Sequence, residues 1–356
     1  MELFLPRIEV NLSQIQDNAQ RVCDLYGQRG ISVMGVSKAV LGEPAIARAM
    51  LRGGVKFIAD SRLENIQRMQ AAGVSAQFVL LRTSLRQAES VVKTVDISLN
   101  SELETLKALS HYAKAHHKRH RVIVMVELGD LREGVLPGDL AQFIQAALRL
   151  PHIDIAGIGC NLACYGGIEP DDKNMRELSE RVNAIEREFD INLELVSGGN
   201  SANYNWYRAS KDVGRVNNLR IGESILLGRE TVSRKAIAGL HTQAFQLFAE
   251  IIESKHKPSL PSGTMGQDAF GNVPTFQDRG IRQRAILALG KQDTLVSGLT
   301  SDSAVQVLGS SSDHMIVDSD RRSFQVGDAV NFDLDYGSLL SAMTSPFIQR
   351  IFVGDR

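Results

Sequence analysis

The stretch "VMGVSKAVLGEPAIARAMLRGGVKFIA" covers residues 33–59 and sets the pattern that decides the fold. It starts with an apolar run at 33–36, continues into an amphipathic segment at 43–54, and returns to an apolar run at 56–59. Pro44 near the start of the middle segment and the glycines at its end are typical of a helix. A short buried strand, a helix and a second buried strand predict a βαβ unit with parallel strands.

The same alternation continues through the first two thirds of the chain. A helical segment at 101–117 opens with Ser101 and Glu104 in the spacing of a capping box. Eight strands joined by helices close naturally into a (β/α)8 TIM barrel, which is the predicted fold class. The candidate strands are 33–36, 56–59, 77–81, 95–99, 122–128, 155–160, 193–196 and 218–221.

After about residue 227 the rhythm changes, because strand-like runs follow one another without regular helices. Clusters of Gly, Pro, Asp and Ser separate these runs, which is typical of an antiparallel β domain. We therefore expect a barrel over residues 1–230 and a C-terminal β domain over residues 231–356. The runs are "QAFQLFAEIIES", "RAILAL", "VQVLGS", "HMIVD" and "AVNFDL".

The composition excludes several classes of function. The 40 basic and 41 acidic side chains leave a net charge of -1, so nothing global indicates a nucleic-acid or membrane partner. Cys23, Cys160 and Cys164 are an odd, scattered set, which argues against a disulfide framework and for a reducing compartment. The N-terminus lacks a signal-peptide layout and no apolar run reaches membrane-spanning length, so we expect a cytoplasmic protein.

Polar residues and glycine-rich loops gather where the predicted strands end. Lys38 ends the first strand, Arg132 follows the fifth and Asn161 follows the sixth. The loop "SGGNSAN" at 197–203 follows the seventh strand and "RIGES" at 220–224 ends the eighth. Alone, such a lysine is usually a solvated charge and such a loop merely turns the chain. Their joint position on the C-terminal rim, where barrel active sites lie, indicates a functional site.

The last two loops resemble an anion cradle. Barrels commonly bind phosphate after strands seven and eight. "GGNSAN" offers the Ser201 hydroxyl and unblocked backbone N–H groups, and Gly222 and Glu223 can add donors from the next loop. A phosphate there, with Lys38 across the rim, predicts pyridoxal phosphate held as a Schiff base. The alternative is a barrel that binds another phosphoester, with Lys38 as a charge partner.

Several motifs resemble the alanine racemase-like, fold-type III pyridoxal-phosphate enzymes. "VMGVSKAVLG", "SGGNSAN" and "RIGESILLG" are similar to that family's cofactor motifs, and "VQVLGSSSDHMIVD" with "VGDAVNFDLDYG" resembles its C-terminal domain. "NLACYGG" and "MGQDAFGN" resemble the branch of amino-acid racemases that includes ornithine racemases. The resemblance covers nearly the whole chain. It implies racemisation of a free amino acid, ornithine or another basic amino acid, by two bases.

The resemblance also assigns cofactor contacts residue by residue. It implies that Lys38 carries the cofactor and acts as one base, and that Asn200 and Ser201 belong to the phosphate loop. Gly222 and Glu223 match the backbone donors on the other side of the phosphate. A metal-dependent eliminase or aldolase on this fold would need a His/Cys pair near the C-terminus. No His or Cys occurs after residue 315, so no metal is expected.

Further positions follow the family only in part. Arg220 matches the arginine that faces the pyridine nitrogen, and Arg132 falls at the substrate-facing arginine. Asn161 stands where the family has a histidine. The family's second base, a tyrosine early in the β domain, is absent from "PSLPSGTMGQDAFGNVP", where Asp268 is the acidic candidate. Its alternative role is that of a turn carboxylate.

Two other functions remain open, and a partner is expected. A pyridoxal-phosphate homeostasis protein resembles the barrel alone, and a fold-type III decarboxylase resembles the same pair of domains but places an acidic residue at the ring nitrogen.

The resemblance implies a homodimer in which the β domain of one chain closes the barrel mouth of the other. Phe270, Phe276 and Tyr336 are plausible anchors for such an interface.

Overall fold

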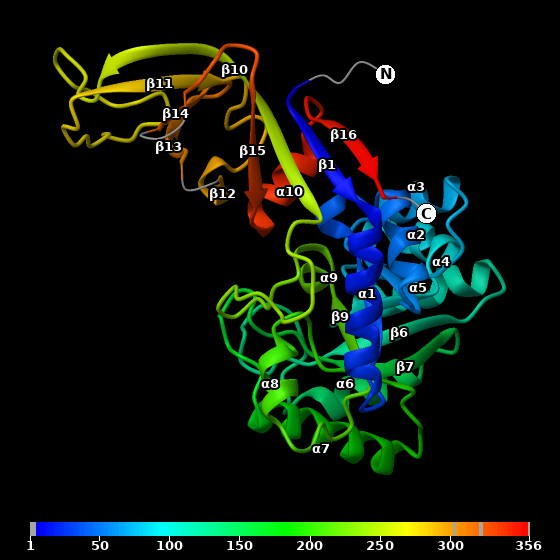
Figure 1. The fold of residues 1–356 in the computed structure, drawn as a ribbon. Coiled ribbons are helices and arrows are strands. Elements are labelled where there is room, and N and C mark those ends of the chain that lie inside the picture. The colour runs from blue at the N-terminus through cyan, green and yellow to red at the C-terminus, as the bar shows by residue number, and fades with distance from the viewer. Residues whose placement is uncertain (1–4, 302–303, 320–322, 355–356) are drawn as a thin grey trace. The chain divides into compact units, whose positions relative to one another are not determined.

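The computed structural model describes residues 5–301, 304–319 and 323–354 of the chain (Figure 1). The chain divides into two compact units. One is Leu12–Thr242, and the other joins the strand β1 (Arg7–Asn11) to the chain from Gln243 onward.

The first unit is a closed barrel of parallel strands in the order β2-β3-β4-β5-β6-β7-β8-β9. Strands β2 and β9 complete the ring, with Met34 of β2 beside Arg220 of β9. The predicted (β/α)8 TIM barrel is therefore confirmed. Its strands are β2 (Ser32–Val36), β3 (Phe57–Asp60), β4 (Gln77–Leu80), β5 (Ile97–Asn100), β6 (His120–Met125), β7 (Ile153–Gly159), β8 (Leu195–Ser197) and β9 (Asn218–Ile221).

Helices connect the barrel strands, and their ends follow from local chemistry. Helix α2 starts at Pro44, whose missing N–H is not needed in a first turn. The capping box predicted at Ser101 is wrong, because the chain is still extended at Glu102, which becomes the N-cap residue without a side-chain cap. The helices are α1 (Leu12–Gly27), α2 (Pro44–Arg52), α3 (Leu63–Ala71), α4 (Ala88–Thr94), α5 (Leu103–Ala115), α6 (Leu140–Leu148), α7 (Asp172–Phe189), α8 (Asn203–Ala209) and α9 (Glu223–Leu227).

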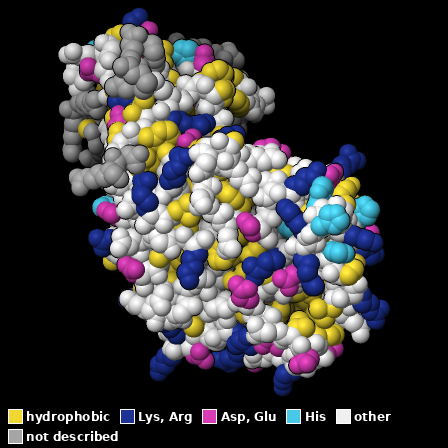
Figure 2. Space-filling model, turned by 90° about the vertical axis from the view of Figure 1, so that its right-hand side faces the viewer, with side chains coloured by type: hydrophobic (Ala, Val, Ile, Leu, Met, Phe, Trp, Pro, Cys, Tyr) yellow, Lys and Arg dark blue, Asp and Glu magenta, His cyan; other side chains and the backbone are white. Residues whose placement is uncertain are grey.

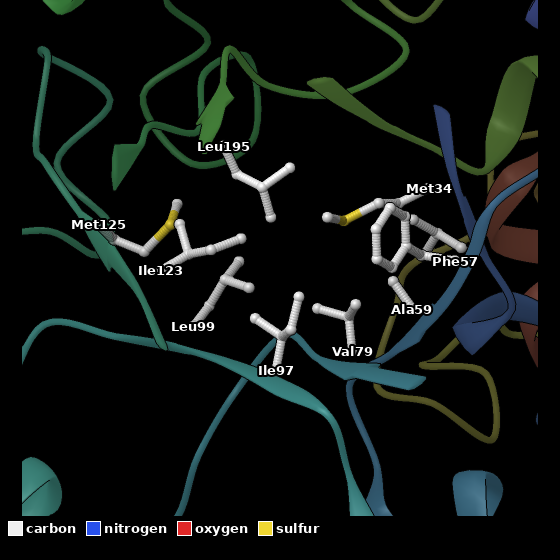
Figure 3. Packing of buried hydrophobic residues seen from close by; sticks show 10 residues of the cluster. Met34, Phe57, Ala59, Val79, Ile97, Leu99, Ile123, Met125 and Leu195 are labelled. Atoms are coloured by element: carbon white, nitrogen blue, oxygen red, sulfur yellow. The ribbon is translucent and has the colours of Figure 1, made fainter. Parts of the chain in front are cut away.

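Apolar side chains from the strands fill the barrel, and Figure 3 shows them pointing toward one another. Alternate residues of a strand face the same side, so Met34 and Val36 of β2 both belong to this core. The core ends where β2 ends, and the next residues, Ser37 and Lys38, begin the polar rim. The buried set is Met34, Val36, Phe57, Ala59, Val79, Ile97, Leu99, Ile123, Met125 and Leu195.

The second unit is built on a mainly antiparallel sheet in the order β12-β15-β10-β11-β14-β13, as expected for the β domain. Strand β1 adds to it, antiparallel to β10 and parallel to β16. A helix, α10 (Tyr336–Thr344), was not expected. The strands are β10 (Phe245–Pro258), β11 (Ile281–Leu287), β12 (Leu299–Thr300), β13 (Gln306–Ser310), β14 (Met315–Ser319), β15 (Ala329–Leu334) and β16 (Gln349–Val353).

The barrel unit extends to Thr242, beyond the expected boundary at residue 230. Asn18 of α1 explains the difference, because its side chain donates to the carbonyl oxygens of Ile225 (3.0 Å) and His241 (2.8 Å) and accepts from His241 N–H (2.7 Å). This buried amide fastens the segment after α9 to the barrel.

The surface mixes charges of both signs, and Figure 2 shows Lys, Arg, Asp and Glu side chains interspersed over the visible face. Over the part of the chain that the structure describes, no helix combines the length and apolar character that crossing a bilayer requires. Within that same part, no three His, Cys, Asp or Glu side chains are arranged to hold a metal ion.

Candidate active site

Lys38 lies at the C-terminal end of β2, in the short 3-10 turn Lys38–Val40. Burial lowers the pKa of its amine, and the positive charges of Arg132 and Arg220 act in the same direction. Lys38 is therefore electrostatically coupled to both Arg132 and Arg220 at the barrel mouth. A lowered pKa increases the unprotonated fraction of the amine, which is the nucleophilic and basic form.

A buried carboxylate fixes the turn that carries Lys38. Asp60, at the end of β3, accepts a hydrogen bond from Ser37 Oγ (2.7 Å). It also accepts from Arg62 N–H (2.9 Å) and from Asn65 Nδ2 (3.0 Å). Burial raises the pKa of Asp60. Asp60 was not among the predicted site residues, although an acidic residue at the end of an apolar strand is a signal that could have found it.

Arg220 is buried inside the barrel end, and its hydrogen bonds go to neutral acceptors. Its Nη1 donates to Ser197 Oγ (2.5 Å), and its Nη2 donates to Cys160 O (2.8 Å) and Asn161 Oδ1 (3.3 Å). Burial lowers the pKa of Arg220, but a guanidinium stays charged at any physiological pH. A donor-only cation in this position cannot accept a proton from a ligand.

Asn161 and Asn200 join the loops after β7 and β8. Asn200 Nδ2 donates to Asn161 Oδ1 (3.1 Å) and to Leu162 O (2.8 Å). The oxygen of Asn161 therefore serves both Asn200 and Arg220, while its buried Nδ2 has no hydrogen-bond partner among the described residues. A buried N–H donor without a partner costs free energy unless a ligand accepts from it.

The glycine-rich loops after β8 and β9 are fastened to each other. Ser224 N–H donates to Ser201 Oγ (3.2 Å) across the two loops. Gly199 has φ +141°, and a Cβ there would lie 2.2 Å from Asn203 Oδ1, so only glycine fits. Within the described part of the chain, the structure shows no acceptor for the backbone N–H groups of Ser201 and Gly222. Both loops thus present backbone donors.

Arg132 lies on the loop after β6, which Glu127 and Asp130 hold in place. Glu127 accepts from Gly129 N–H (2.5 Å), Leu131 N–H (3.0 Å) and Arg132 N–H (3.1 Å). The Arg132 guanidinium pairs with Glu133, and this hydrogen bond is the main cause that raises the pKa of Arg132.

Asp130 connects this loop to the loop after β7. Its carboxylate accepts from the N–H groups of Cys164 (3.2 and 3.3 Å), Tyr165 (2.9 Å) and Ile168 (3.4 Å). Neither Glu127 nor Asp130 was predicted from the sequence. The signal was present in "VELGD", where two acids come shortly after the end of a buried strand.

Asp268 belongs to the second unit and forms a tight turn there. Its Oδ1 accepts from Phe270 N–H (2.8 Å) and Asn272 N–H (2.9 Å). Backbone hydrogen bonds from Asn272 and Phe270 lower the pKa of Asp268. The geometry is that of a turn carboxylate, and the role of second base stays a prediction.

The barrel and its rim define a class of enzyme that combines a lysine of lowered pKa, a buried arginine and glycine-rich anion loops. The chain belongs to the alanine racemase, N-terminal domain, family, whose match covers residues 10–230. The predicted racemase class and pyridoxal phosphate as its cofactor are thereby confirmed.

Individual relatives extend the likeness over nearly the whole chain. An ornithine racemase of Acetoanaerobium sticklandii is 42% identical over 97% of this chain and 99% of its own length. A lysine racemase of Thermotoga maritima is 38% identical over 98% of this chain and 99% of its own. The crystal structure of an alanine racemase from Streptomyces lavendulae aligns with a TM-score of 0.79 at 17% identity, over 100% of this chain and 99% of that one, which shows the shared fold.

Proposed function

We propose that this protein racemises a free basic amino acid, ornithine or lysine, with pyridoxal phosphate. Two relatives with these substrates in their names, at 42% and 38% identity over nearly the full length, support this choice. The observation that carries the proposal is the presence of both Lys38 and the buried guanidinium of Arg220 at one barrel mouth. Burial lowers the pKa of Lys38.

The residues present fit the cofactor. Lys38 would hold it covalently, and Arg220 would face its ring nitrogen as a donor that stays charged. The unpartnered Nδ2 of Asn161 supplies a buried donor for an oxygen of the ligand. Asn200 would keep Asn161 in position through its hydrogen bond of 3.1 Å.

The phosphate would be held by Ser201, Gly222 and Glu223. The open backbone N–H groups of Ser201 and Gly222 support this assignment, since converging backbone donors bind anions well. Glu223 would contribute its backbone N–H, while its side chain pairs with Arg234.

When bound, pyridoxal phosphate supplies an electron sink that makes the α-proton of an amino acid acidic. Lys38, whose lowered pKa favours the uncharged amine, removes or returns that proton on one face. Arg132 binds the substrate carboxylate, for which a planar guanidinium is suited through two parallel hydrogen bonds. Asp268 is proposed to handle the proton on the opposite face. Arg220 would limit side reactions, because its guanidinium can donate a hydrogen bond to the ring nitrogen without transferring a proton to it.

A chiral assay tests this function. Purified protein with added cofactor is incubated with the L-forms of ornithine, lysine, arginine, serine and alanine, and the D-enantiomers are separated by chiral chromatography. Racemisation of ornithine or lysine supports the proposal. Release of carbon dioxide and a diamine would indicate a decarboxylase, and cofactor binding without turnover of any substrate would indicate a homeostasis protein; either result would overturn the proposal.

The racemase is further proposed to be a cytoplasmic homodimer with shared active sites. Phe270 and Phe276 are 46% and 47% exposed, which supports their role as interface anchors beside Tyr336. The three free cysteines support a reducing compartment. Mixing inactive Lys38→Ala protein with inactive Asp268→Asn protein should restore activity if the sites are shared. A fully active monomer would contradict the dimer.

A further inference from the structure

A basic amino acid carries a second charge that an active site has to recognise. Its α-carboxylate suits Arg132, but its distal ammonium needs an anionic partner, since an unpaired buried ammonium is costly. The neighbour of Arg132 on the same loop is a glutamate, Glu133, and the two side chains are paired to each other. This pair matches the two ends of the substrate in charge.

We propose that Glu133 binds the distal ammonium of the substrate, an inference that rests on the proposed racemase function. In the free enzyme, Arg132 Nη2 donates to Glu133 Oε1 (2.5 Å) and Arg132 Nε donates to Glu133 Oε2. The substrate carboxylate replaces Glu133 on Arg132, and the substrate ammonium replaces Arg132 on Glu133. One ion pair becomes two, and no charge is left without a partner.

The backbone that carries this pair is already fixed. Glu127 holds the N–H groups of Gly129, Leu131 and Arg132. Gly134 has φ +141°, and a Cβ there would meet Glu127 N at 2.4 Å, so the chain returns tightly against the end of β6. By contrast, the side chains of Arg132 and Glu133 are 40% and 32% exposed. A rigid loop with two movable side chains is suited to exchange partners without reorganising the rim.

Both members of the pair act on the reactive centre. The positive charge of Arg132 contributes to the lowered pKa of Lys38, after burial as the main cause. The negative charge of Glu133 raises the pKa of Arg220 against the larger effect of burial. Arg132 and Glu133 are therefore each electrostatically coupled to a group of the candidate site.

Several other carboxylates of the barrel rim have fixed partners. Asp60, Glu127 and Asp130 each accept backbone N–H groups that hold loops in place. Glu230 accepts from the N–H groups of residues 232, 233 and 235. Glu223 is the first residue of α9 and pairs with Arg234. It lies beside the proposed phosphate loops, so an ammonium group bound there would interact with the phosphate. Glu133 differs because its partner is a side chain that the substrate itself engages.

The test compares Glu133→Gln with the wild type on L-ornithine and L-norvaline, which has the same carbon chain without the ammonium. Glutamine keeps an acceptor for Arg132 but removes the charge. The ratio of kcat/KM for ornithine over norvaline should fall about thirtyfold, which corresponds to about 2 kcal/mol. Glu169→Gln, which changes an exposed carboxylate on the neighbouring loop, is the matched control and should leave the ratio unchanged.

A binding measurement separates this inference from the racemase proposal. The Kd of α-methylornithine, which has no α-proton to lose, should weaken about tenfold or more in Glu133→Gln, while that of α-methylnorvaline should not. A ratio of kcat/KM and a Kd both within about threefold of wild type would overturn the role of Glu133, with racemisation by the wild type left intact. A wild type that racemises none of these amino acids overturns the proposed function instead, and selective weakening of α-methylornithine binding would then still support Glu133.

Discussion

Replacing Asp130 by asparagine should release two loops of the active site at once. The buried Asp130 carboxylate accepts N–H groups from Cys164, Tyr165 and Ile168, at 2.9 to 3.4 Å. Its backbone oxygen accepts from Gly166 N–H (2.9 Å). The loop after β7 is therefore wrapped around one side chain of the loop after β6. Arg132 and Glu133 lie on the loop after β6, and Asn161 lies on the loop after β7.

The size of the effect follows from the number of donors. Hydrogen bonds to a charged acceptor contribute about 1.5–3 kcal/mol each, and asparagine keeps only one of the two acceptor oxygens. Its NH₂ group would face backbone N–H donors, which leaves at least one of them buried without a partner. We expect the loop after β7 to lose about 3 kcal/mol of local stability. That corresponds to more than a hundredfold loss of hydrogen-exchange protection in this loop.

Hydrogen exchange of the amides of residues 164–168 measures this directly, alongside the melting temperature and kcat/KM. Misplacing substrate-binding groups by about 1 Å costs roughly a hundredfold in rate, so kcat/KM should fall by that order. Asp139→Asn is the control, because Asp139 precedes α6 without a side-chain cap. Wild-type exchange rates at residues 164–168 in Asp130→Asn would refute the reasoning, whatever happened to the activity.

Three other outcomes follow from the same structure. Lys38→Ala should lose the visible absorption of the bound cofactor, and borohydride reduction of the wild type should place the cofactor mass on the peptide with Lys38; the mass on another lysine would refute the assignment. A maleimide at neutral pH should label the exposed Cys164 and not Cys160, whose pKa burial raises to about 12, and mass spectrometry of the folded protein distinguishes the two. Burial lowers the pKa of His120 to about 4, so the unfolded chain takes up a proton first as pH falls below 6.5. The free energy of unfolding should therefore drop by up to about 3 kcal/mol between pH 6.5 and 4, and urea titrations of His120→Gln should show a flatter dependence; equal slopes would contradict it.

The fold could be read from the sequence because its signals are local. The alternation of apolar runs with amphipathic segments is written within each stretch of about thirty residues, and it placed all the barrel strands. Strand β1 was missed because its partners, β10 and β16, lie hundreds of residues away along the chain. The extension of the barrel unit to Thr242 was missed for the same reason, since it depends on Asn18 reaching His241. Pairing across such distances leaves no mark on the short-range pattern.

The site was predictable where position along a strand is enough. Lys38, Arg132, Asn161 and Arg220 each follow or end a strand, and in a parallel barrel those ends meet on one rim. The electrostatic coupling of Lys38 to Arg132 and Arg220 agrees with that expectation. What a side chain does at the rim depends on its partners, which lie on other loops. Glu127 was overlooked because its hydrogen-bond donors are backbone N–H groups, which every residue except proline carries.

The acidic residues of the rim show why partners matter more than residue type. Asp130 and Glu133 lie on one loop and look equivalent in the sequence, yet the first is buried against backbone donors and the second pairs with an exposed guanidinium. A change at Asp130 removes acceptors that no other group replaces, so it should affect every substrate alike. A change at Glu133 leaves the backbone untouched and alters only which charge the loop presents. Asp130 thus stabilises the loops of the barrel mouth, and Glu133 is the acid proposed to bind the substrate. Specificity can then change at one position without a cost to the loop that carries it.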